Sequence, residues 1–172
     1  MDLNLHSARG RWRPMAEADL PATNALAAFI HPAYPEDEAV FAERLALYPA
    51  GCRVFEQGDR TVAYVVSHPW RRFGAPALNS LLGALPAAPS TFYIHDLALS
   101  PEVRNTGAAA RIVAWLVEHA LAEHIQHMSL VAVNGSTGFW QRQGFTAKLD
   151  RTLARALGSY GGDAQYMMRD LS

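Results

Sequence analysis

The chain has 172 residues, half of them hydrophobic, which is enough for one domain with a full core and too apolar for a disordered chain. Its 15 basic residues are balanced by 16 acidic ones, so it lacks the basic excess expected of a nucleic-acid-binding protein. The one cysteine, Cys52, excludes an internal disulfide and favours a reducing compartment. No apolar run approaches the roughly 20 residues of a membrane span, and residues 1–13 lack a secretory core, which favours a cytoplasmic protein with no membrane contact.

The first half of the chain predicts two helices followed by a β-hairpin. We expect residues 1–10 to be a loose leader and residues 11–172 to form a single domain. Apolar residues at helical spacing, closed off by prolines, indicate the helices, and β-branched and aromatic runs on both sides of a glycine-containing turn indicate the hairpin. The predicted elements are an extended segment at 11–15, helices at 19–31 and 35–47, and strands at 52–56 and 61–67.

Residues 68–90 are predicted to be an irregular insertion, because four prolines fall within them. Four leucines within residues 77–85 have helical spacing, which predicts a short helix there. An insertion of this length is typically a lid, a binding loop or a disordered segment. Its apolar content favours the first two of these.

The second half contains the clearest periodic signals. A strand at 91–99 ends before Pro101, and a helix at 107–125 follows with one apolar stripe along its length. An apolar strand comes next, so residues 91–133 form a β-α-β unit, and the whole order of elements predicts an α+β fold with a mixed sheet. The remaining predicted elements are a strand at 128–133, a helix at 136–143, and strands at 145–149 and 165–169.

The turn between the strand at 91–99 and the following helix has the composition of an anion site. Small residues, Gly107 and the alanines at 108–110, open the helix without screening its backbone, and Arg104 adds a cation nearby. Unpaired N–H groups and the helix dipole at such a position favour a phosphate group. The alternative is an ordinary strand-to-helix corner whose glycine relieves turn strain. The segment matches neither the Walker A motif nor the three-glycine dinucleotide fingerprint.

Three motifs in this part of the chain together resemble one family. Residues 104–109, Arg-Asn-Thr-Gly-Ala-Ala, fit the Arg/Gln-x-x-Gly-x-Gly/Ala pattern that follows the fourth strand of GNAT acyltransferases. Residues 96–102 match that family's Asp-Leu-Ala-Val-x-Pro-Glu strand end, and residues 138–145 resemble its Phe-Tyr-x-x-x-Gly-Phe segment. The ordered set spans about residues 91–146. The resemblance implies the acyl-CoA N-acyltransferase fold, an α+β fold with a mixed, mostly antiparallel sheet flanked by helices.

The resemblance also implies a binding site for acetyl-CoA as co-substrate. In the family, the pantetheine arm of the donor enters between the splayed fourth and fifth strands and bonds to backbone at positions matching Leu97 and Leu99, and the diphosphate lies on the turn at 104–110. Asn134 matches a residue that commonly contacts the donor. The implied donor-binding residues are Leu97, Ala98, Leu99, Arg104, Asn105, Thr106, Gly107, Ala108, Ala109, Ala110, Asn134, Phe139 and Trp140.

Acetyl transfer to an amine needs a base, because an ammonium must lose a proton before it can attack. A histidine has a suitable reference pKa of roughly 6.5, and strand alternation places His95 on one face with Tyr93 and Leu97, and Asp96 on the other. The serotonin N-acetyltransferase branch of the family has two histidines at positions matching 93 and 95. The candidate catalytic residues are therefore His95, Asp96 and Tyr93. The alternative for His95 is a satisfied, half-buried strand histidine, and Asp96 is either a second base or a structural acceptor.

The general acid is the point at which the sequence departs from the family. The family often uses a tyrosine to reprotonate the departing thiolate, and Trp140 stands at that position here. An indole N–H donates a hydrogen bond but gives up no proton at neutral pH. Coenzyme A therefore leaves without an enzymic acid or takes its proton from another hydroxyl. The hydroxyls that we consider are those of Tyr93, Ser136, Tyr160 and Tyr166.

The resemblance implies direct transfer of an acetyl group from acetyl-CoA to the primary amine of a small molecule. Two alternatives stay open: a catalytically weak CoA-binding or sensing module, and a protein acetyltransferase acting on lysines or an N-terminus. We expect no metal site, because His119 and His124 are five residues apart and do not share a helix face. Family members often dimerise, so the resemblance is compatible with a homodimer.

Overall fold

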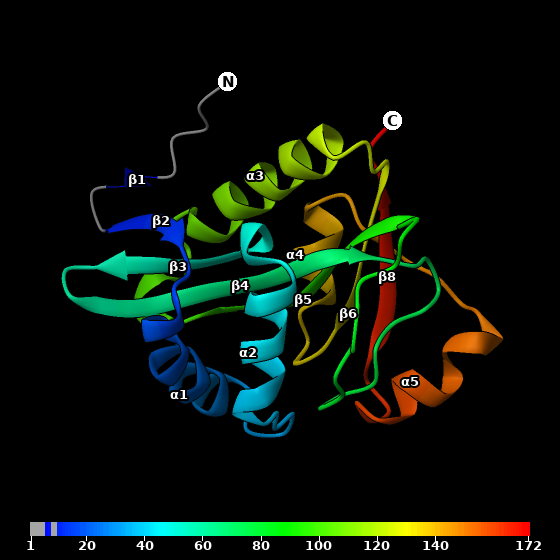
Figure 1. The fold of residues 1–172 in the computed structure, drawn as a ribbon, viewed down its shortest axis with the longest axis horizontal. Coiled ribbons are helices and arrows are strands. Elements are labelled where there is room, and N and C mark those ends of the chain that lie inside the picture. Colours follow the sequence, from blue (N-terminus) through cyan, green and yellow to red (C-terminus); the bar gives the residue numbers. More distant parts are fainter. Residues whose placement is uncertain (1–5, 8–9) are drawn as a thin grey trace.

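One mixed β-sheet forms the centre of the molecule (Figure 1). The structure, a computed structural model, describes residues 6–7 and 10–172, so residues 1–5 and 8–9 of the expected leader lie outside the described residues. The sheet order is β1-β2-β3-β4-β5-β6-β8-β7, and β5 with β6 is the one parallel pairing among the described strands. This arrangement confirms the predicted α+β fold. The strands are β1 (His6–Ser7), β2 (Gly10–Pro14), β3 (Cys52–Gln57), β4 (Arg60–Trp70), β5 (Thr91–Leu99), β6 (His127–Ala132), β7 (Thr146–Ala147) and β8 (Gln165–Asp170).

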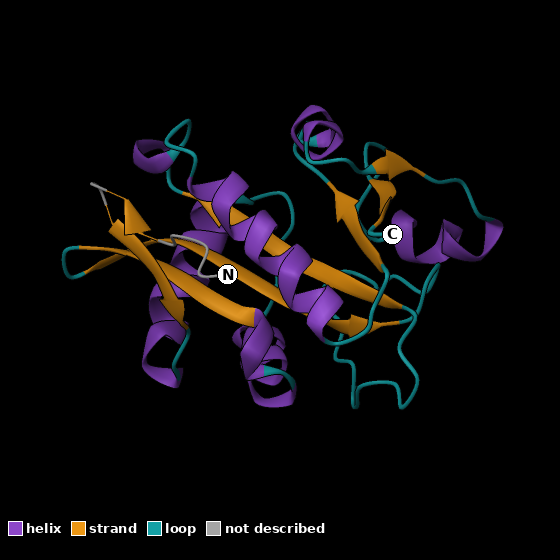
Figure 2. Ribbon diagram, turned by 90° about the horizontal axis from the view of Figure 1, so that it is seen from above, coloured by secondary structure: helices purple, strands orange, loops and turns teal. Residues whose placement is uncertain are grey.

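Helices cover both faces of the sheet (Figures 1 and 2). Side chains alternate along β3 and β4, so that Val54 and Tyr64 face a layer formed with α1 and α2, whereas Phe55 and Val65 face a layer formed with α3 and α4. The helices are α1 (Leu20–Ile30), α2 (Glu38–Leu47), α3 (Ala108–Ala122), α4 (Thr137–Arg142) and α5 (Ala154–Gly158), with short 3₁₀ turns at Glu17–Asp19, Pro49–Gly51, Pro101–Val103 and Arg151–Leu153.

The start of helix α3 is fixed by its own sequence and by one long-range contact. Its apolar stripe is buried over most of its predicted length, with Ile112 and Leu116 fully inaccessible, but Leu121, which the prediction included, is 44% exposed. Gly107 precedes the first turn with φ 83°, a left-handed conformation that glycine adopts without a steric penalty. The indole Nε1 of Trp12 donates a hydrogen bond of 3.0 Å to the carbonyl of Ala108. The N-terminus of α3 is therefore held in a defined position at one edge of the cavity described below.

Strand β4 is longer than the sequence predicts. It continues to Trp70, whereas the prediction ended at residue 67, and Pro69 pairs with Phe92 of β5. On its other side, β4 pairs with β3 only as far as Val66. Pro69 therefore lies where β4 has a free edge, and the N–H that proline lacks costs no sheet hydrogen bond there.

The predicted helix at 77–85 is wrong, because the backbone donors of this segment bond to side chains instead of to each other. The N–H of Asn79 donates to Glu36 Oε2 over 3.0 Å, and the N–H of Leu82 donates to Glu43 Oε1 over 2.7 Å. Asn79 also has a φ of 57°, which a right-handed helix does not allow. Hydrogen bonds from the backbone to carboxylates distant in the sequence thus replace the helix that the leucine spacing predicts.

The C-terminal part differs in two respects from the prediction. The expected strand at 145–149 is reduced to Thr146–Ala147, and helix α5 forms in a segment predicted to be a loop. Helix α5 is held against the sheet by a tertiary contact, because Leu153 in the turn before it is buried against Tyr166 of β8.

Strands β5 and β6 separate after a short parallel pairing. Their paired residues run from Phe92 with Met128 to Ile94 with Leu130, and beyond this point both strands continue without bonding to each other. Figure 1 shows β5 and β6 turning apart. The separation has the form that the family resemblance implies.

The packing of α3 on the sheet can be tested by replacing leucine with alanine at one buried and one exposed position of this helix. Leu116→Ala should lower the free energy of unfolding by about 3 kcal/mol, because it leaves a cavity in the core. Leu121 is 44% exposed, and Leu121→Ala should cost less than about 1 kcal/mol. Urea unfolding followed by circular dichroism measures both, and equal losses would contradict the packing described here.

Candidate functional site

A cavity of about 630 Å³ lies where β5 and β6 separate. Its walls come from the diverging parts of both strands, the start of α3, helix α4 and the connection between α1 and α2. All the implied donor-binding residues line it except Thr106 and Ala108. The lining members of that set are Leu97, Ala98, Leu99, Arg104, Asn105, Gly107, Ala109, Ala110, Asn134, Phe139 and Trp140.

The turn before α3 presents free backbone donors to this cavity. The first backbone hydrogen bond inside the helix is that from Arg111 N to Gly107 O, at 3.0 Å. The N–H groups of Ala109 and Ala110 precede that bond, as the first donors of any helix do, and both residues line the cavity. Arg104 is tied back by a hydrogen bond of 3.1 Å from its Nε to the carbonyl of Leu99. The cavity therefore has a positive, donor-rich end.

A β-bulge lies in β5 at the catalytic candidates. Asp96 pairs with Val66, and Ile94 pairs with Ser67, so one step along β4 corresponds to two steps along β5. His95 is the extra residue and has no partner on β4. A bulge of this kind interrupts the alternation of side chains between the two faces of a sheet.

The bulge overturns the predicted directions of three side chains. His95 packs its ring against Phe41 of α2, with the ring centroids 6.2 Å apart, and Asp96 accepts a hydrogen bond from Tyr64 on the same face. Leu97 packs into the other layer, which contains α3. The prediction that His95 shares a face with Leu97 and opposes Asp96 is therefore wrong. His95 and Asp96 lie on one side, towards α1 and α2.

His95 forms a buried pair with Glu36 from the connection between α1 and α2. His95 Nε2 lies 2.8 Å from Glu36 Oε1, and the two side chains are 1% and 7% exposed. The other carboxylate oxygen of Glu36 accepts the N–H of Asn79. His95 Nδ1 is buried and has no hydrogen-bond partner among the described residues. Glu36 thus holds His95 by its Nε2 atom.

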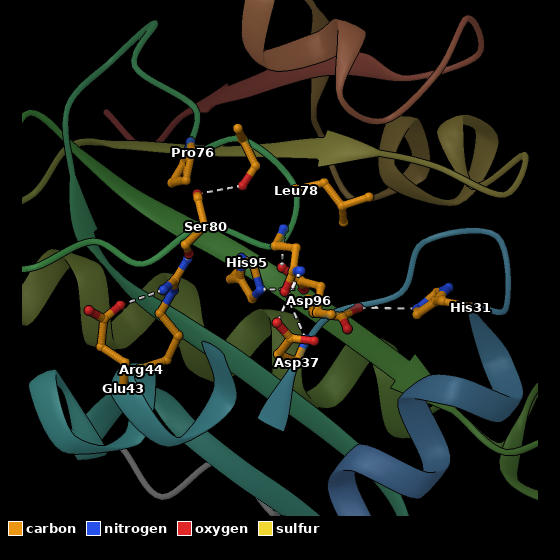
Figure 3. Close-up of polar contacts among 12 residues, drawn as sticks. His31, Asp37, Glu43, Arg44, Pro76, Leu78, Ser80, His95 and Asp96 are labelled. Carbon is orange, nitrogen blue, oxygen red and sulfur yellow. Dashed lines mark hydrogen bonds and ion pairs between the residues drawn. The ribbon is translucent and has the colours of Figure 1, made fainter. Parts of the chain in front are cut away.

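Asp96 belongs to a second polar group, which extends towards the mouth of the cavity. Its Oδ2 accepts a hydrogen bond of 2.5 Å from the hydroxyl of Tyr64, and its Oδ1 lies 3.1 Å from His31 Nε2 at the end of α1 (Figure 3). His31 Nδ1 lies 2.6 Å from Nδ2 of Asn134, which follows β6. This group therefore connects β4, β5, the end of α1 and the end of β6.

The charges of this second group are set by its contacts. Burial alone would raise the pKa of Asp96, but the contacts with His31 and Tyr64 outweigh it and hold that pKa below its ordinary value. Burial alone would lower the pKa of His31, but the neighbouring carboxylate of Asp96 outweighs it and raises that pKa above its ordinary value. Asp96 is therefore ionised at neutral pH, and its carboxylate favours the protonated form of His31.

The structure separates the remaining acid–base candidates. Tyr93 is 1% exposed, packs near Tyr166 and does not line the cavity, and burial raises its pKa well above the ordinary value. Trp140 forms part of the cavity wall and is packed against the core. Of the hydroxyls considered, those of Ser136 and Tyr160 belong to lining residues.

Sequence reasoning missed the contribution of the connection between α1 and α2. His31, Tyr34 and Glu36 all line the cavity from this segment. The prolines at 32 and 35 marked a helix break, but no local signal shows that the break lies beside β5. Only the packing of α1 and α2 on the sheet brings these side chains to the bulge.

The insertion after β4 is an ordered wall of the cavity. On one side Arg44 Nη2 of α2 donates to the carbonyl of Ser80 over 3.0 Å, and on the other the hydroxyl of Ser159 accepts the N–H of Leu78 over 2.9 Å (Figure 3). Leu78 itself lines the cavity. The segment is thus fastened to α2 and to the chain after α5, and it contributes Leu78 to the cavity wall.

Two absences concern residues 6–7 and 10–172. No helix in this range is long and apolar enough to cross a bilayer. No group of three or more His, Cys, Asp or Glu side chains in this range could hold a metal ion.

The fold and the cavity define an acyltransferase-like architecture, and comparison of the sequence agrees with it. A sequence profile described as the acetyltransferase (GNAT) family matches residues 12–145. The chain therefore belongs to the acetyltransferase (GNAT) family. No protein of curated function matches the sequence at a significant level.

Solved structures share the fold over almost the whole chain. The loading GNATL domain of CurA from Lyngbya majuscula has a TM-score of 0.78 at 13% identity, over 94% of this chain and 98% of that one. The GphF GNAT-like decarboxylase in complex with isobutyryl-CoA has a TM-score of 0.70 at 20% identity, over 94% and 100%. Arabidopsis thaliana Naa50 in complex with the bisubstrate analogue CoA-Ac-MVNAL has 0.68 at 11%, over 95% and 99%. At these identities the likeness establishes the fold alone.

A buried histidine behind the site should make the stability of the protein depend on pH. Burial lowers the pKa of His68 to about 3, whereas the unfolded chain takes up this proton near pH 6.5. The unfolded state therefore binds more protons below pH 6.5, so stability falls as the pH is lowered, by about 2 kcal/mol between pH 7 and pH 5.

Urea unfolding of the wild type and of His68→Gln at both pH values measures this contribution. The loss between pH 7 and pH 5 should be smaller in His68→Gln, because the neutral side chain has no proton to gain. His124→Gln, at an exposed position, serves as the control and should behave as the wild type. An unchanged loss in His68→Gln would contradict a neutral, buried His68.

Proposed function

We propose that this protein transfers the acetyl group of acetyl-CoA to the primary amine of a small molecule. The observation that carries the proposal is the separation of β5 from β6. It opens one cavity that runs from the free N–H groups at the start of α3 to the histidine–carboxylate pairs at the bulge. The family to which the chain belongs supports the acetyl transfer.

The residues along this cavity fit an acyl-CoA donor. Beyond Ile94, β5 has an edge that does not bond to β6, so backbone groups of residues 97–99 on that edge can bond with the amide groups of a pantetheine arm, apart from the Leu99 carbonyl, which accepts the hydrogen bond from Arg104. The N–H groups of Ala109 and Ala110, the helix dipole and Arg104 suit a diphosphate. Acetyl-CoA supplies a carbonyl activated by its thioester. The proposed donor site therefore uses the strand edge for the arm and the helix start for the phosphates.

The acceptor end of the cavity supports a small amine more than a peptide. The insertion after β4 is held beside this end by hydrogen bonds on both of its sides, including that from Tyr160 Oη to the carbonyl of Pro76 at 3.2 Å, and Leu78 and Tyr160 narrow the space for an acceptor. The proteins of similar fold do not decide the acceptor, since one is in complex with a peptide-bearing analogue and another is named a decarboxylase. The acceptor class is therefore decided by measuring whether CoA release depends on a small amine or on a peptide.

Two of the sequence candidates for acid–base chemistry lie at the bulge in β5. Of the sequence candidates, His95 and Asp96 line the cavity, whereas Tyr93 does not. The likeness to the serotonin N-acetyltransferase branch rests on His95 alone, because Tyr93 stands where that branch has its other histidine. The hydroxyl of Tyr160 is the proposed source of a proton for the departing thiolate, because it belongs to a lining residue at the acceptor end.

The proposal is tested by measuring CoA release from acetyl-CoA by thiol detection, with and without acceptors. The acceptors compared are small amines, amino acids, and short peptides with a free N-terminus or a lysine. A thermal-shift assay measures acetyl-CoA binding in parallel. We expect binding, and release that depends on a small amine. Binding without release for any acceptor would indicate a CoA-sensing module instead. Release with peptides only would indicate a protein acetyltransferase, and absence of binding would contradict the donor site itself.

The turn before α3 gives a matched pair of glycine variants. Gly107→Ala places a side chain at φ 83°, which strains the backbone of the turn, and puts its Cβ 3.1 Å from Arg111 Nη1, which must move slightly. We expect acetyl-CoA to bind about tenfold more weakly, a change of about 1.4 kcal/mol. At Gly162 an added Cβ meets no atom within 4 Å, so Gly162→Ala should bind as the wild type. Isothermal titration calorimetry measures both, and equal affinities would contradict a donor site at this turn.

A further inference from the structure

We propose that His31 is the general base of the reaction and that Asp96 and Tyr64 are its positioning residues. The inference rests on the proposed acetyl transfer to an amine and names the group that receives the proton. His31 ends α1 and lies outside every motif that resembles the family. Only the packing of α1 beside β5 makes it part of the site.

The contacts of His31 assign different roles to its two nitrogens. Nε2 faces Asp96 Oδ1 at 3.1 Å, an ion-pair contact without hydrogen-bond geometry, and the carboxylate favours a proton on the nitrogen that faces it. Nδ1 lies 2.6 Å from Nδ2 of Asn134, which is a donor, so Nδ1 holds the lone pair. The neutral ring therefore has its basic nitrogen on the side of the cavity at which β6 ends. A carboxylate that fixes the tautomer of a histidine in this way is the arrangement of a general base.

Asp96 is itself held in one orientation. Its second oxygen accepts the hydroxyl of Tyr64 over 2.5 Å, and Tyr64 is fully buried in the layer between the sheet and α1 and α2. Both oxygens of the carboxylate are thus in contact, one with Tyr64 and one with His31, of which Figure 3 shows the second. Because β4 and β5 form the centre of the sheet, this support is rigid.

His95 is less suited to receive the proton. Its Nε2 is already hydrogen-bonded to Glu36 at 2.8 Å, a contact that an acceptor at this atom would have to displace. The side chain of His95 is 1% exposed, whereas that of His31 is 14% exposed. An acceptor in the cavity reaches His31 without displacing a buried pair. His95 and Glu36 then shape the acceptor end and contribute its negative charge.

The charges around His31 suit a base that works near neutral pH. Burial opposes a raised pKa, but the contact with Asp96 outweighs it, so the pKa of His31 lies above the ordinary histidine value. The charged groups that face His31 are Asp96 on β5, Glu36 on the α1–α2 connection and Arg104 on the β5–α3 turn, of which only Arg104 lowers its pKa. Tyr64 and His95 act on it through Asp96.

The reaction that follows is balanced in atoms and charge. The acceptor enters as an ammonium and takes the place of the Asn134 amide at His31 Nδ1, which removes one proton and leaves a neutral amine. The amine nitrogen forms a bond to the thioester carbonyl carbon, the bond from that carbon to sulfur breaks, and the sulfur departs with the electron pair. The hydroxyl of Tyr160 gives its proton to the thiolate and takes up the second proton lost by the nitrogen, and His31 returns its own proton to solvent.

The pH dependence of kcat/KM separates a base from a merely structural histidine. Neutral His31 is the active form, so kcat/KM of the wild type should rise with pH and level off above a midpoint higher than roughly 6.5. Asp96→Asn removes the carboxylate that raises the pKa of His31, so the midpoint should move to lower pH, and the plateau should fall. An unchanged midpoint in a folded Asp96→Asn would overturn the inference.

Variants of the histidines themselves give a second, independent test. His31→Gln should lower kcat/KM by about 100-fold or more while acetyl-CoA binding persists. His95→Gln should lose less activity than His31→Gln, and His124→Asn, at an exposed position in the turn after α3, should match the wild type. Imidazole added to His31→Gly should restore part of the activity, which a structural role would not allow. This rescue holds as a test even where Asp96→Asn does not fold.

The failures of the two proposals are distinguishable. An active wild type with a fully active His31→Gln, or a His31→Gly that imidazole does not rescue, overturns the role of His31 and leaves the acetyltransferase proposal in place. A wild type that acetylates no amine overturns the proposed function, and the role of His31 falls with it.

Discussion

Strands β5 and β6 bond to each other from Phe92 with Met128 to Ile94 with Leu130, and past that point each has an edge with unused backbone groups. Buried backbone donors and acceptors need partners, so an edge that faces a cavity is suited to a ligand with amide groups of its own. The same divergence brings the start of α3 and the end of β6 to opposite sides of one space. The positions of the proposed donor, acceptor and base all depend on this single interruption of the sheet.

The second constraint is the burial of charged groups at the bulge. Asp96 remains ionised in the interior only because Tyr64 and His31 both contact its carboxylate. Glu36 is satisfied in a similar way by His95 and the backbone of Asn79. Leaving a buried charge without such partners costs several kcal/mol, roughly the effect of breaking a buried ion pair. The two pairs therefore fix the connection between α1 and α2 against β5, and the same contacts that stabilise the fold prepare the site for proton transfer.

The sequence predicted those parts of the fold that depend on local patterns. The apolar stripe of α3, the left-handed glycine before it and the small residues that follow are visible as composition and spacing, and the structure places them as expected. The bulge at His95 was not predictable in this way, because it exists only in the register between β4 and β5. His31 and Glu36 carry no motif, and they reach the site through the packing of α1 and α2. The helix expected at 77–85 failed because the carboxylates of Glu36 and Glu43, far away in sequence, satisfy its backbone donors.

Hydrogen–deuterium exchange of the backbone amides, with and without coenzyme A, tests the central claim most directly, because it reports on each proposed contact without requiring turnover. The account predicts that coenzyme A slows exchange in two segments, residues 97–99 on the free edge of β5 and residues 104–110 at the start of α3. Exchange in the groove between α1 and α2 should not change. Slowing confined to other segments, or no slowing at a saturating concentration of coenzyme A, would contradict a donor site between β5 and β6.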